Sequence, residues 1–274
     1  MLAAIVATAT AISVLLGGAA PAPAAPTWAP AATATIHPGV QTFTRGGQCT
    51  ANFVFTDTTA VYIGQAAHCA GTGGNTETNG CLSSSLPLGT PVTVGGASRP
   101  GVLAYSSWVT MHNTGESDPA ICQFNDLALV RLDPADVGKV NPSMPHWGGP
   151  VGLAASSSPI TSLVYSSGNS ELRLGLALLQ PKLGVSLGDH AGGWSHHVLT
   201  LTPGIPGDSG SGFLDAQGRA LGELSTIEIL PMPGTNGVGD LRLELDYMHA
   251  KTASNAQLAV GTQPFNGSQL PLGP

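Results

Sequence analysis

Gly207-Asp208-Ser209-Gly210 lies late in this chain of 274 residues, and two earlier stretches belong with it. They are Ala66-Ala67-His68-Cys69 and Asn125-Asp126-Leu127-Ala128-Leu129. A serine hydroxyl holds its proton too tightly to be a good nucleophile near neutral pH. It becomes reactive when an imidazole accepts that proton and a carboxylate fixes the tautomer and the charge of the imidazole. The three stretches therefore supply the set of groups that nucleophilic catalysis by serine requires.

Glycine residues around Ser209 suit a loop that presents this side chain to another molecule. Gly207 can adopt backbone angles that point its amide hydrogen into a pocket, and Gly210 would leave room for a substrate main chain. We expect the amides of Gly207 and Ser209 to form an oxyanion hole. A simple turn is the alternative interpretation, because Gly-Asp-Ser-Gly is also typical of turns.

His68 and Asp126 each stand next to an expected strand. His68 follows an apolar segment and precedes Cys69, so a disulfide would anchor it near the strand end. Asp126 begins a segment that otherwise has the composition of a buried strand, and a buried carboxylate is costly without a partner. An imidazole N–H is a suitable partner, and a strand-end cap is the alternative role. Asp118 and Asp133 are rival carboxylates, but both adjoin proline in expected turns.

The composition favours a turn-rich β protein. Charged residues make up 9% of the chain and hydrophobic residues 42%, with 37 Gly and 22 Pro. Helical surfaces usually carry many more Glu and Lys. The net charge of −7, with nine Lys and Arg and no basic run, gives no electrostatic footprint for nucleic acid.

Short β-favouring segments alternate with turn residues along most of the chain. The expected strands are residues 51–56, 60–65, 102–110, 127–132, 163–165, 172–179, 198–201 and 221–229. From Asp240 onward the apolar residues recur at helical spacing, with Asp240 at or near the helix N-terminus. The final residues are rich in Asn, Gln, Gly and Pro, which predicts a loose tail.

The N-terminus is typical of a secretory signal peptide, because the apolar run Leu2 to Leu16 is followed by small residues suitable for cleavage. The usual positive n-region is missing. A membrane anchor is the competing interpretation, but about fifteen apolar residues are short for a span. We therefore expect a secreted, extracellular protein with no stable membrane association after cleavage.

Four cysteines fit an oxidising destination, and they allow three pairings. Cys49 with Cys69 is the favoured pair, because it would tie neighbouring strands beside His68, and Cys81 would then pair with Cys122. Free buried thiols are the alternative. A zinc site is poorly supported, because no pair has Cys-x-x-Cys spacing. The histidines besides His68 are expected to be structural: His37, His112, His146, His190, His196, His197 and His249.

Together the three stretches resemble the signatures of the chymotrypsin-like (trypsin-like) serine proteases, in that family's order. The resemblance covers roughly residues 40 to 255, and Cys-Thr-Ala-Asn-Phe at 49–53 is similar to secreted bacterial members. It implies an all-β fold of two packed antiparallel β-barrels, each six-stranded, with a C-terminal α-helix. The expected organisation is a signal peptide (1–25), a linker or short pro-region (26–40), an N-terminal barrel (41–150), a C-terminal barrel (151–239), a helix (240–255) and a tail (256–274).

The resemblance also suggests residues that bind substrate. Leu221-Gly222-Glu223-Leu224-Ser225 resembles the strand that pairs with the substrate backbone, and Ser225 matches the serine near the triad aspartate. Thr226 and Ile227 stand where an aromatic residue and a glycine often occur, and Ile227 would narrow the primary pocket. Pro203 stands six residues before Ser209, so no acid is there to bind Arg or Lys. We therefore expect a preference for small or apolar side chains.

The partner that we expect for Asp208 differs from its partner in the family's zymogens. Asp208 pairs with a freshly cut N-terminus in zymogen-activated relatives, but this chain has no clear activation site. We expect a basic side chain of the chain itself to be its partner.

The sequence thus predicts a secreted serine endopeptidase acting through an acyl-enzyme, with His68 as general base, Asp126 as its orienting group and Ser209 as nucleophile. No metal or organic cofactor is implied, the expected partner is a peptide or protein substrate, and a monomer is expected. A catalytically weak homologue that binds peptides is the main alternative. A secreted esterase is a lesser one, because Ser209 is followed by strand-like Phe213-Leu214 and not by a helix.

Overall fold

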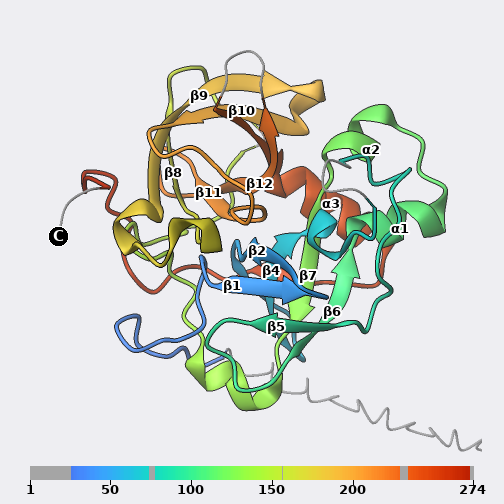
Figure 1. The fold of residues 1–274 in the computed structure, drawn as a ribbon, viewed down its shortest axis with the longest axis horizontal. Coiled ribbons are helices and arrows are strands. Elements are labelled where there is room, and N and C mark those ends of the chain that lie inside the picture. The colour runs from blue at the N-terminus through green and yellow to red at the C-terminus, as the bar shows by residue number, and fades with distance from the viewer. Residues whose placement is uncertain (1–25, 74–77, 156, 229–233, 272–274) are drawn as a thin grey trace, which may run out of the picture.

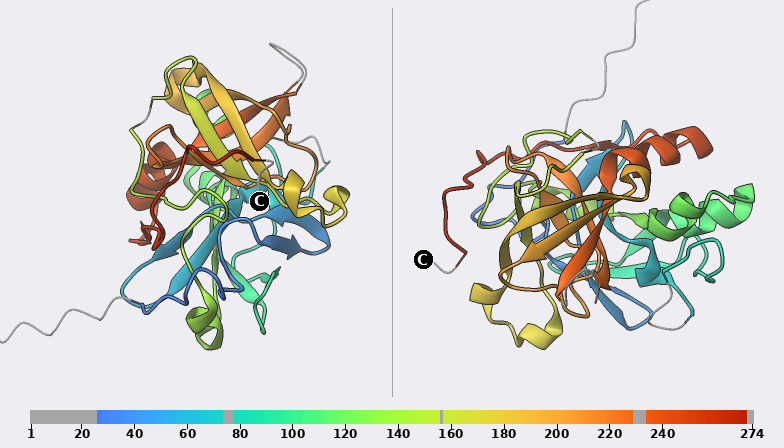
Figure 2. Two further views of the ribbon diagram at one scale, coloured as in Figure 1. Left: turned by 90° about the vertical axis from the view of Figure 1, so that its left-hand side faces the viewer. Right: turned by 90° about the horizontal axis from the view of Figure 1, so that it is seen from above.

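The computed structural model describes residues 26–73, 78–155, 157–228 and 234–271. The expected signal peptide lies outside these residues. Two antiparallel β units make up most of the molecule, with helices at their edges (Figure 1). In the left view of Figure 2 the unit formed by the second half of the chain lies above the unit formed by the first half. The expectation of an all-β fold is confirmed.

The first unit is an eight-stranded sheet in the order β14-β3-β4-β7-β6-β5-β1-β2. This sheet is a half-barrel, and its edge strand β14 is added from a segment late in the chain. Its strands are β1 (Gln41–Thr44), β2 (Gly47–Thr50), β3 (Val54–Thr56), β4 (Val61–Ala66), β5 (Pro91–Val94), β6 (Gly101–Ser106), β7 (Leu127–Arg131) and β14 (Gln257–Leu258).

The second unit is a closed barrel in the order β10-β13-β12-β11-β8-β9. All of its strand pairs are antiparallel, and each unit has its own buried apolar cluster. Its strands are β8 (Leu163–Ser167), β9 (Pro181–His190), β10 (Ser195–Thr200), β11 (Gly212–Leu214), β12 (Ala220–Glu228) and β13 (Thr235–Asp240).

The C-terminal helix α3 (Leu241–Lys251) begins directly after β13. The Asp240 carboxylate accepts the Leu243 amide hydrogen at 2.8 Å, so Asp240 caps the helix as expected. The helix is shorter than the expected range 240–255. The remaining helices are η1 (Ala67–Ala70), α1 (Ser107–Thr114), α2 (Pro119–Phe124), η2 (Pro134–Lys139), η3 (Glu171–Arg173), η4 (Ala177–Leu179) and η5 (Ala191–Gly193). Within the described part of the chain, every helix is too short or too polar to cross a membrane.

Two expected strands are partly or wholly wrong. Residues 107–110 form the start of α1, because the Ser106 hydroxyl accepts the Val109 amide hydrogen and caps a helix there. Residues 172–179 form η3, η4 and the turn between them. The leucines of this segment are exposed, with Leu174 85% accessible, so they have no buried face against which a strand would pack.

The expected loose tail is in fact packed against both units. Strand β14 pairs with β3, and the Ala259 amide donates to the Val54 carbonyl at 2.9 Å. Farther along, the Gly149 amide donates to the Gln263 carbonyl at 3.0 Å. Phe265 packs against Tyr165 of the second unit with ring centroids 5.1 Å apart. Polar composition therefore concealed a segment whose few apolar side chains are used in packing.

Candidate active site

Strand pairing brings His68 and Asp126 together. Strands β4 and β7 are antiparallel neighbours, with Ala66 opposite Leu127. The residues just beyond this pair therefore meet at one end of the sheet, where the Ala67 amide donates to the Asp126 carbonyl. His68 lies in η1, which continues from β4, and Asp126 immediately precedes β7. Their separation along the chain is 58 residues, so only the sheet register places them side by side.

The Asp126 side chain is buried and accepts three hydrogen bonds. His68 Nδ1 lies 2.6 Å from Oδ2, and the His68 backbone amide donates to Oδ1 at 2.8 Å. The Ser225 hydroxyl donates to Oδ2 at 2.7 Å. The rival carboxylates have other roles, because Asp118 caps α2 and Asp133 caps η2. The structure thus joins His68, Asp126 and Ser225 in one hydrogen-bonded group.

This group changes the basicity of the imidazole. Burial disfavours the charged imidazole, but the adjacent Asp126 carboxylate outweighs burial and raises the pKa of His68 above its ordinary value. With Nδ1–H donated to Asp126, Nε2 is the nitrogen that carries the free lone pair. An imidazole held in this way can accept a proton at Nε2.

The loop that carries Ser209 packs against the strand end that leads to His68. The Ser209 carbonyl accepts the Thr50 amide hydrogen at 2.8 Å, and the Gly210 amide donates to Leu224 at 2.7 Å. Gly210 has φ +84°, and a Cβ built on it would lie 2.6 Å from the Ala66 nitrogen. Gly210 therefore makes room for the backbone of the first sheet. Among the described residues, no hydrogen bond joins the Ser209 side chain to His68.

Two backbone amides beside Ser209 are unpaired. In the described part of the chain, the amides of Gly207 and Ser209 have no hydrogen-bond partner, whereas the Asp208 and Gly210 amides do. Gly207 has φ +94°, which favours glycine, and its carbonyl accepts from the Thr50 hydroxyl at 2.8 Å. The loop is therefore held by two of its amides and by its carbonyls, whereas the Gly207 and Ser209 N–H groups make no bond within the described residues.

Asp208 is fully buried and pairs with two cations of the same chain. The Arg173 guanidinium donates to both of its oxygens, and Lys182 Nζ lies 2.9 Å from Oδ2. Burial would raise the pKa of Asp208, but Arg173 and Lys182 hold it below its ordinary value. Burial lowers the pKa of Lys182 to about 8 despite this partner. The expected basic partner of Asp208 is thus present as a pair of residues.

Asn236 is a residue that sequence reasoning missed. It lies in β13 opposite Ile227 and is fully buried, whereas Ile227 is 48% exposed. Its Oδ1 accepts from the Gly204 amide at 3.0 Å, and its Nδ2 donates to the Thr226 carbonyl at 3.5 Å. The side chain therefore spans the space between the segment before Ser209 and the end of β12. No local pattern reveals this role, because it depends on the register of β12 and β13.

The Pro203 carbonyl lies on the same side of this space as Gly204. It accepts from Arg173 Nη2 at 2.9 Å and from Lys182 Nζ at 3.2 Å. As the sequence indicated, residue 203 offers no acid. Both cations near it are already bonded to Asp208.

The disulfides join Cys49 with Cys69 and Cys81 with Cys122, the pairs that the sequence favoured. The first ties β2 to η1, next to His68. One group of possible metal ligands in the described residues, Cys49, His68 and Cys69, has its ligand atoms within 4.8 Å of one another. Its two sulfurs are bonded to each other and offer no thiolate, so the group does not fit a metal.

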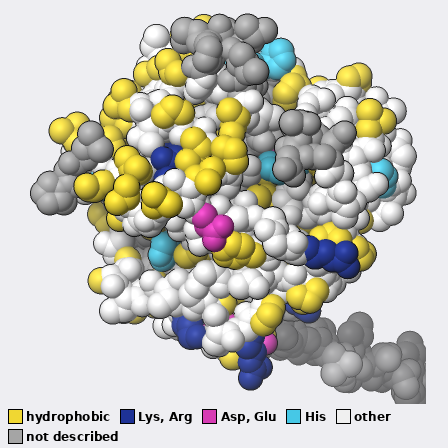
Figure 3. Space-filling model, in the orientation of Figure 1, with side chains coloured by type: hydrophobic (Ala, Val, Ile, Leu, Met, Phe, Trp, Pro, Cys, Tyr) yellow, Lys and Arg dark blue, Asp and Glu magenta, His cyan; other side chains and the backbone are white. Residues whose placement is uncertain are grey.

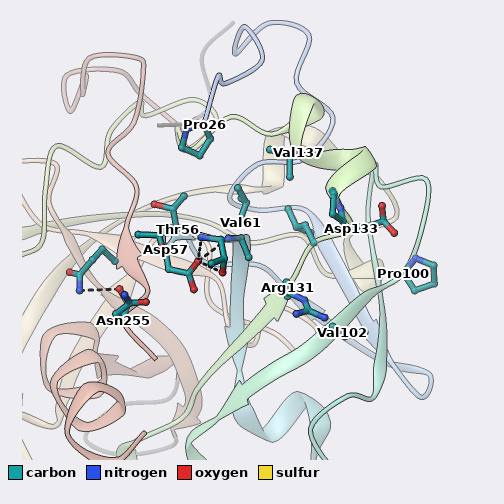
Figure 4. A pocket seen from close by; sticks show the side chains of 16 residues that line it. Pro26, Thr56, Asp57, Val61, Pro100, Val102, Arg131, Asp133, Val137 and Asn255 are labelled. Atoms are coloured by element: carbon teal, nitrogen blue, oxygen red, sulfur yellow. Dashed lines mark hydrogen bonds between the residues drawn. The ribbon is translucent and has the colours of Figure 1, made fainter. Parts of the chain in front are cut away.

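A groove of about 1090 Å³ lies at the opposite end of the same strands (Figure 4). Val61, the first residue of β4, and Arg131, the last residue of β7, both line it. His68 and Asp126 adjoin the other ends of these strands, so the groove is separate from the candidate active site.

No protein-family profile and no curated protein sequence matches this chain. Solved structures do match. Thermobifida fusca protease A is 18% identical, with a TM-score of 0.53, and the match covers 82% of this chain and 99% of that one. A Nocardiopsis protease is 20% identical, with a TM-score of 0.48, over 81% and 98% of the two chains. Cellulomonas bogoriensis chymotrypsin is 18% identical, with a TM-score of 0.48, over 82% and 98%. With its barrel, its second β unit and its C-terminal helix, the chain has the chymotrypsin-like serine protease fold.

Proposed function

We propose that the protein is a serine endopeptidase that cleaves peptide bonds through an acyl-enzyme. The observation that carries this proposal is the His68 imidazole, bonded to buried Asp126 at 2.6 Å beside the loop of Ser209. The unpaired Gly207 and Ser209 amides and the fold itself support it. Thermobifida fusca protease A, which has the same fold, is a protease.

In the first half of the reaction, Ser209 Oγ attacks the substrate carbonyl carbon, and its proton passes to His68 Nε2. The carbonyl oxygen becomes an oxyanion that accepts hydrogen bonds from the Gly207 and Ser209 amides. Asp126 stabilises the imidazolium through Nδ1 and is fixed by Ser225. Collapse of the intermediate breaks the C–N bond, and His68 gives its proton to the leaving amine.

In the second half, water attacks the acyl-enzyme and gives its proton to His68. The second tetrahedral intermediate expels Ser209 Oγ, which regains the proton, and the carboxylic acid product leaves. In this mechanism Ser209 Oγ moves within hydrogen-bonding range of Nε2 when substrate binds, because catalytic contacts often tighten only in the complex.

We infer that the preferred side chain before the cleaved bond is small. Asn236 fills the space between Gly204 and Thr226. In position, this space resembles the primary pocket of the chymotrypsin-like family, which receives the side chain before the cleaved bond. A substrate side chain larger than alanine or valine would collide with this buried amide. The two disulfides fit an oxidising compartment, so we propose a secreted, monomeric enzyme with residues 1–25 as its signal peptide.

A peptide-binding homologue with little activity is the second candidate. It is favoured by one observation, which is that no hydrogen bond joins Ser209 to His68 within the described residues. In that case the same space would hold a peptide without cleaving it.

An organophosphonate probe separates the two candidates. Purified wild type, Ser209→Ala, and His68→Ala are incubated with the probe, and labelling is located by peptide mass spectrometry. We expect label on Ser209 of the wild type, none in Ser209→Ala, and slow labelling in His68→Ala. Label that persists in Ser209→Ala would refute the nucleophile assignment. A folded wild type that takes no label but binds peptides would favour the second candidate.

A further inference from the structure

Two glutamates lie fully buried behind the candidate triad, on the side of Asp126 that faces the second unit. Glu223 belongs to β12 and Glu244 to α3, and both are 0% exposed. A Cβ built on Gly239 would lie 2.9 Å from Glu244 Oε1 and 3.1 Å from Glu223 Oε1. The two carboxyl groups therefore face one small space.

Donors for this pair are scarce. Glu244 Oε1 accepts the Asp126 backbone amide hydrogen at 2.7 Å. Among the described residues, both Glu223 oxygens and Glu244 Oε2 find no donor. Two bare carboxylates in this position would be two unpaired buried charges, which is prohibitively costly. One proton held between them removes one charge and supplies the missing donor.

The groups around the pair do not compensate for negative charge. Asp126 faces it from the start of β7, and Asp240 faces it from the end of β13. Tyr105 of β6 interacts electrostatically with both glutamates, and Tyr247 of α3 lies next to Tyr105. Each of these two aspartates is already bonded to an imidazole, Asp126 to His68 and Asp240 to His196.

This setting changes the acidity of both groups. Burial raises the pKa of Glu223, and the charges of Asp126 and Asp240 raise it further. Burial and the adjacent Glu223 raise the pKa of Glu244. Both directions favour the protonated form, as does the scarcity of donors around the pair.

The pair contacts the candidate triad through the backbone amide of Asp126. Glu244 fixes the Asp126 amide, while Ser225, two residues beyond Glu223 in β12, fixes the Asp126 carboxylate. Asp126 comes from the first unit, whereas α3 and β12 come from the second half of the chain. The two glutamates therefore connect the two halves of the molecule at the residue that orients His68.

We propose that Glu223 and Glu244 share one proton and act together as a positioning pair that holds Asp126 against His68. This inference rests on the proposed function for its catalytic consequence. Because the pair is more basic in the folded state than in the unfolded state, the folded state loses stability as the pH rises from about 5 to about 8. Loss of the shared proton above that range loosens Asp126 and gives the activity an alkaline limit.

The proton itself is tested by NMR on the full chain carrying carboxyl-labelled ¹³C-glutamate. We expect two glutamate signals to titrate far above the others, and each to be assigned by its loss in Glu223→Gln or Glu244→Gln. In either variant the remaining carboxylate accepts from the new amide, so its titration returns toward the ordinary range. Glu171→Gln, an exposed matched control, should leave both shifted signals in place. Ordinary titration of every glutamate would overturn the proposal.

The positioning role is tested by kinetics and by the His68 signal. We expect Glu244→Leu, which removes the acceptor of the Asp126 amide, to lower kcat roughly 10- to 100-fold with KM little changed. Glu244→Gln keeps an acceptor oxygen and should restore kcat and remove the alkaline limit. The downfield Nδ1–H proton signal of His68 should move in Glu244→Leu and not in Glu171→Gln.

An alkaline limit that is unchanged in both Gln variants would contradict the positioning role, even if Glu244→Leu fails to fold. The experiment also distinguishes the two proposals. If the wild type is never labelled by the phosphonate but both glutamates titrate at raised pH, the proposed protease activity is refuted and the proposal of a shared proton is retained. Labelled wild type with ordinary glutamate titrations refutes only the pair.

Discussion

Asp208 illustrates how a single buried charge can shape a loop. Its two oxygens accept hydrogen bonds from the side chains of Arg173 and Lys182 and from the backbone amides of Ser170 and Ile205. These bonds hold the segment before Ser209 in place. Removing one partner of a buried ion pair leaves charge that nothing compensates. The basic partner that the sequence led us to expect for Asp208 is therefore supplied by Arg173 and Lys182.

Arg173→Met should lower the free energy of unfolding by about 3 kcal/mol, because Asp208 loses its bidentate partner while Lys182 remains. The phosphonate labelling rate of Ser209 should fall with it. Urea unfolding followed by tryptophan fluorescence gives the first quantity. Arg219→Met is the matched control, because Arg219 pairs with Asp215 at the surface and should cost less than about 1 kcal/mol. Equal losses in the two variants would contradict the special role of Arg173.

Asn236→Ala should open the space between Gly204 and Thr226. We expect kcat/KM for substrates with leucine or phenylalanine before the cleaved bond to rise about tenfold relative to alanine substrates. A series of fluorogenic peptides differing only at that position measures the change. Asn141→Ala, at a buried amide bonded to Ala29 and Thr262, controls for general destabilisation. An unchanged preference would remove Asn236 from the pocket.

At the scale of single residues, the sequence identifies those functional candidates that lie in a recognisable local motif. His68, Asp126 and Ser209 stand in stretches that resemble known signatures. Asn236 and Glu244 do not, because their roles arise from the pairing of β12 with β13 and from the packing of α3. The close approach of Ala66 to Gly210 could not be predicted either, since only the fold reveals which backbone lies there.

Among the elements, strands were predictable where apolar runs end at turn residues, as in β4 and β7. They were not predictable where leucines are exposed, as in residues 172–179, because hydrophobicity alone does not say which face is buried. The segment after β6 was misassigned for another reason. A serine cap started α1 within a β-favouring run.

The two disulfides should differ in what they support. Replacing either pair with serine should cost about 3 to 4 kcal/mol of unfolding free energy, because loops of 20 and 41 residues are released. Loss of Cys49–Cys69 should also slow labelling of Ser209, since it ties η1 to β2 beside His68. Loss of Cys81–Cys122 should leave labelling of the folded protein nearly unchanged. Guanidinium titrations and labelling rates measure both effects, and identical labelling in the two variants would argue against this division.

For the whole molecule, the resemblance anticipated two β units and a final helix, and only the second unit closes as a barrel. The first is an eight-stranded half-barrel whose edge strand β14 comes from a segment late in the chain. Composition could not predict this, since the last residues have the polarity of a tail. The face in Figure 3 is dominated by hydrophobic and uncharged side chains, as a charged fraction of 9% implies.

Truncation after Asn255 should destabilise the whole protein by more than about 2 kcal/mol, because β14 and the contacts of Gln263 and Phe265 are lost together. Differential scanning calorimetry should show a lower Tm. Val260→Ser, in the same segment but 55% exposed, should change stability by about 0.5 kcal/mol or less. A truncated chain with the wild-type Tm would mean that this segment is dispensable.

Strand β14 has a consequence for the order of synthesis. The edge of β3 receives its partner from Gln257 and Leu258, which leave the ribosome some two hundred residues after β3 itself. During translation, the first half of the polypeptide therefore has an unpaired strand edge at β3, and the Asp126 amide lacks its hydrogen bond to Glu244. The arrangement delays a finished architecture, and with it any reactive centre, until the polypeptide has emerged past Leu258.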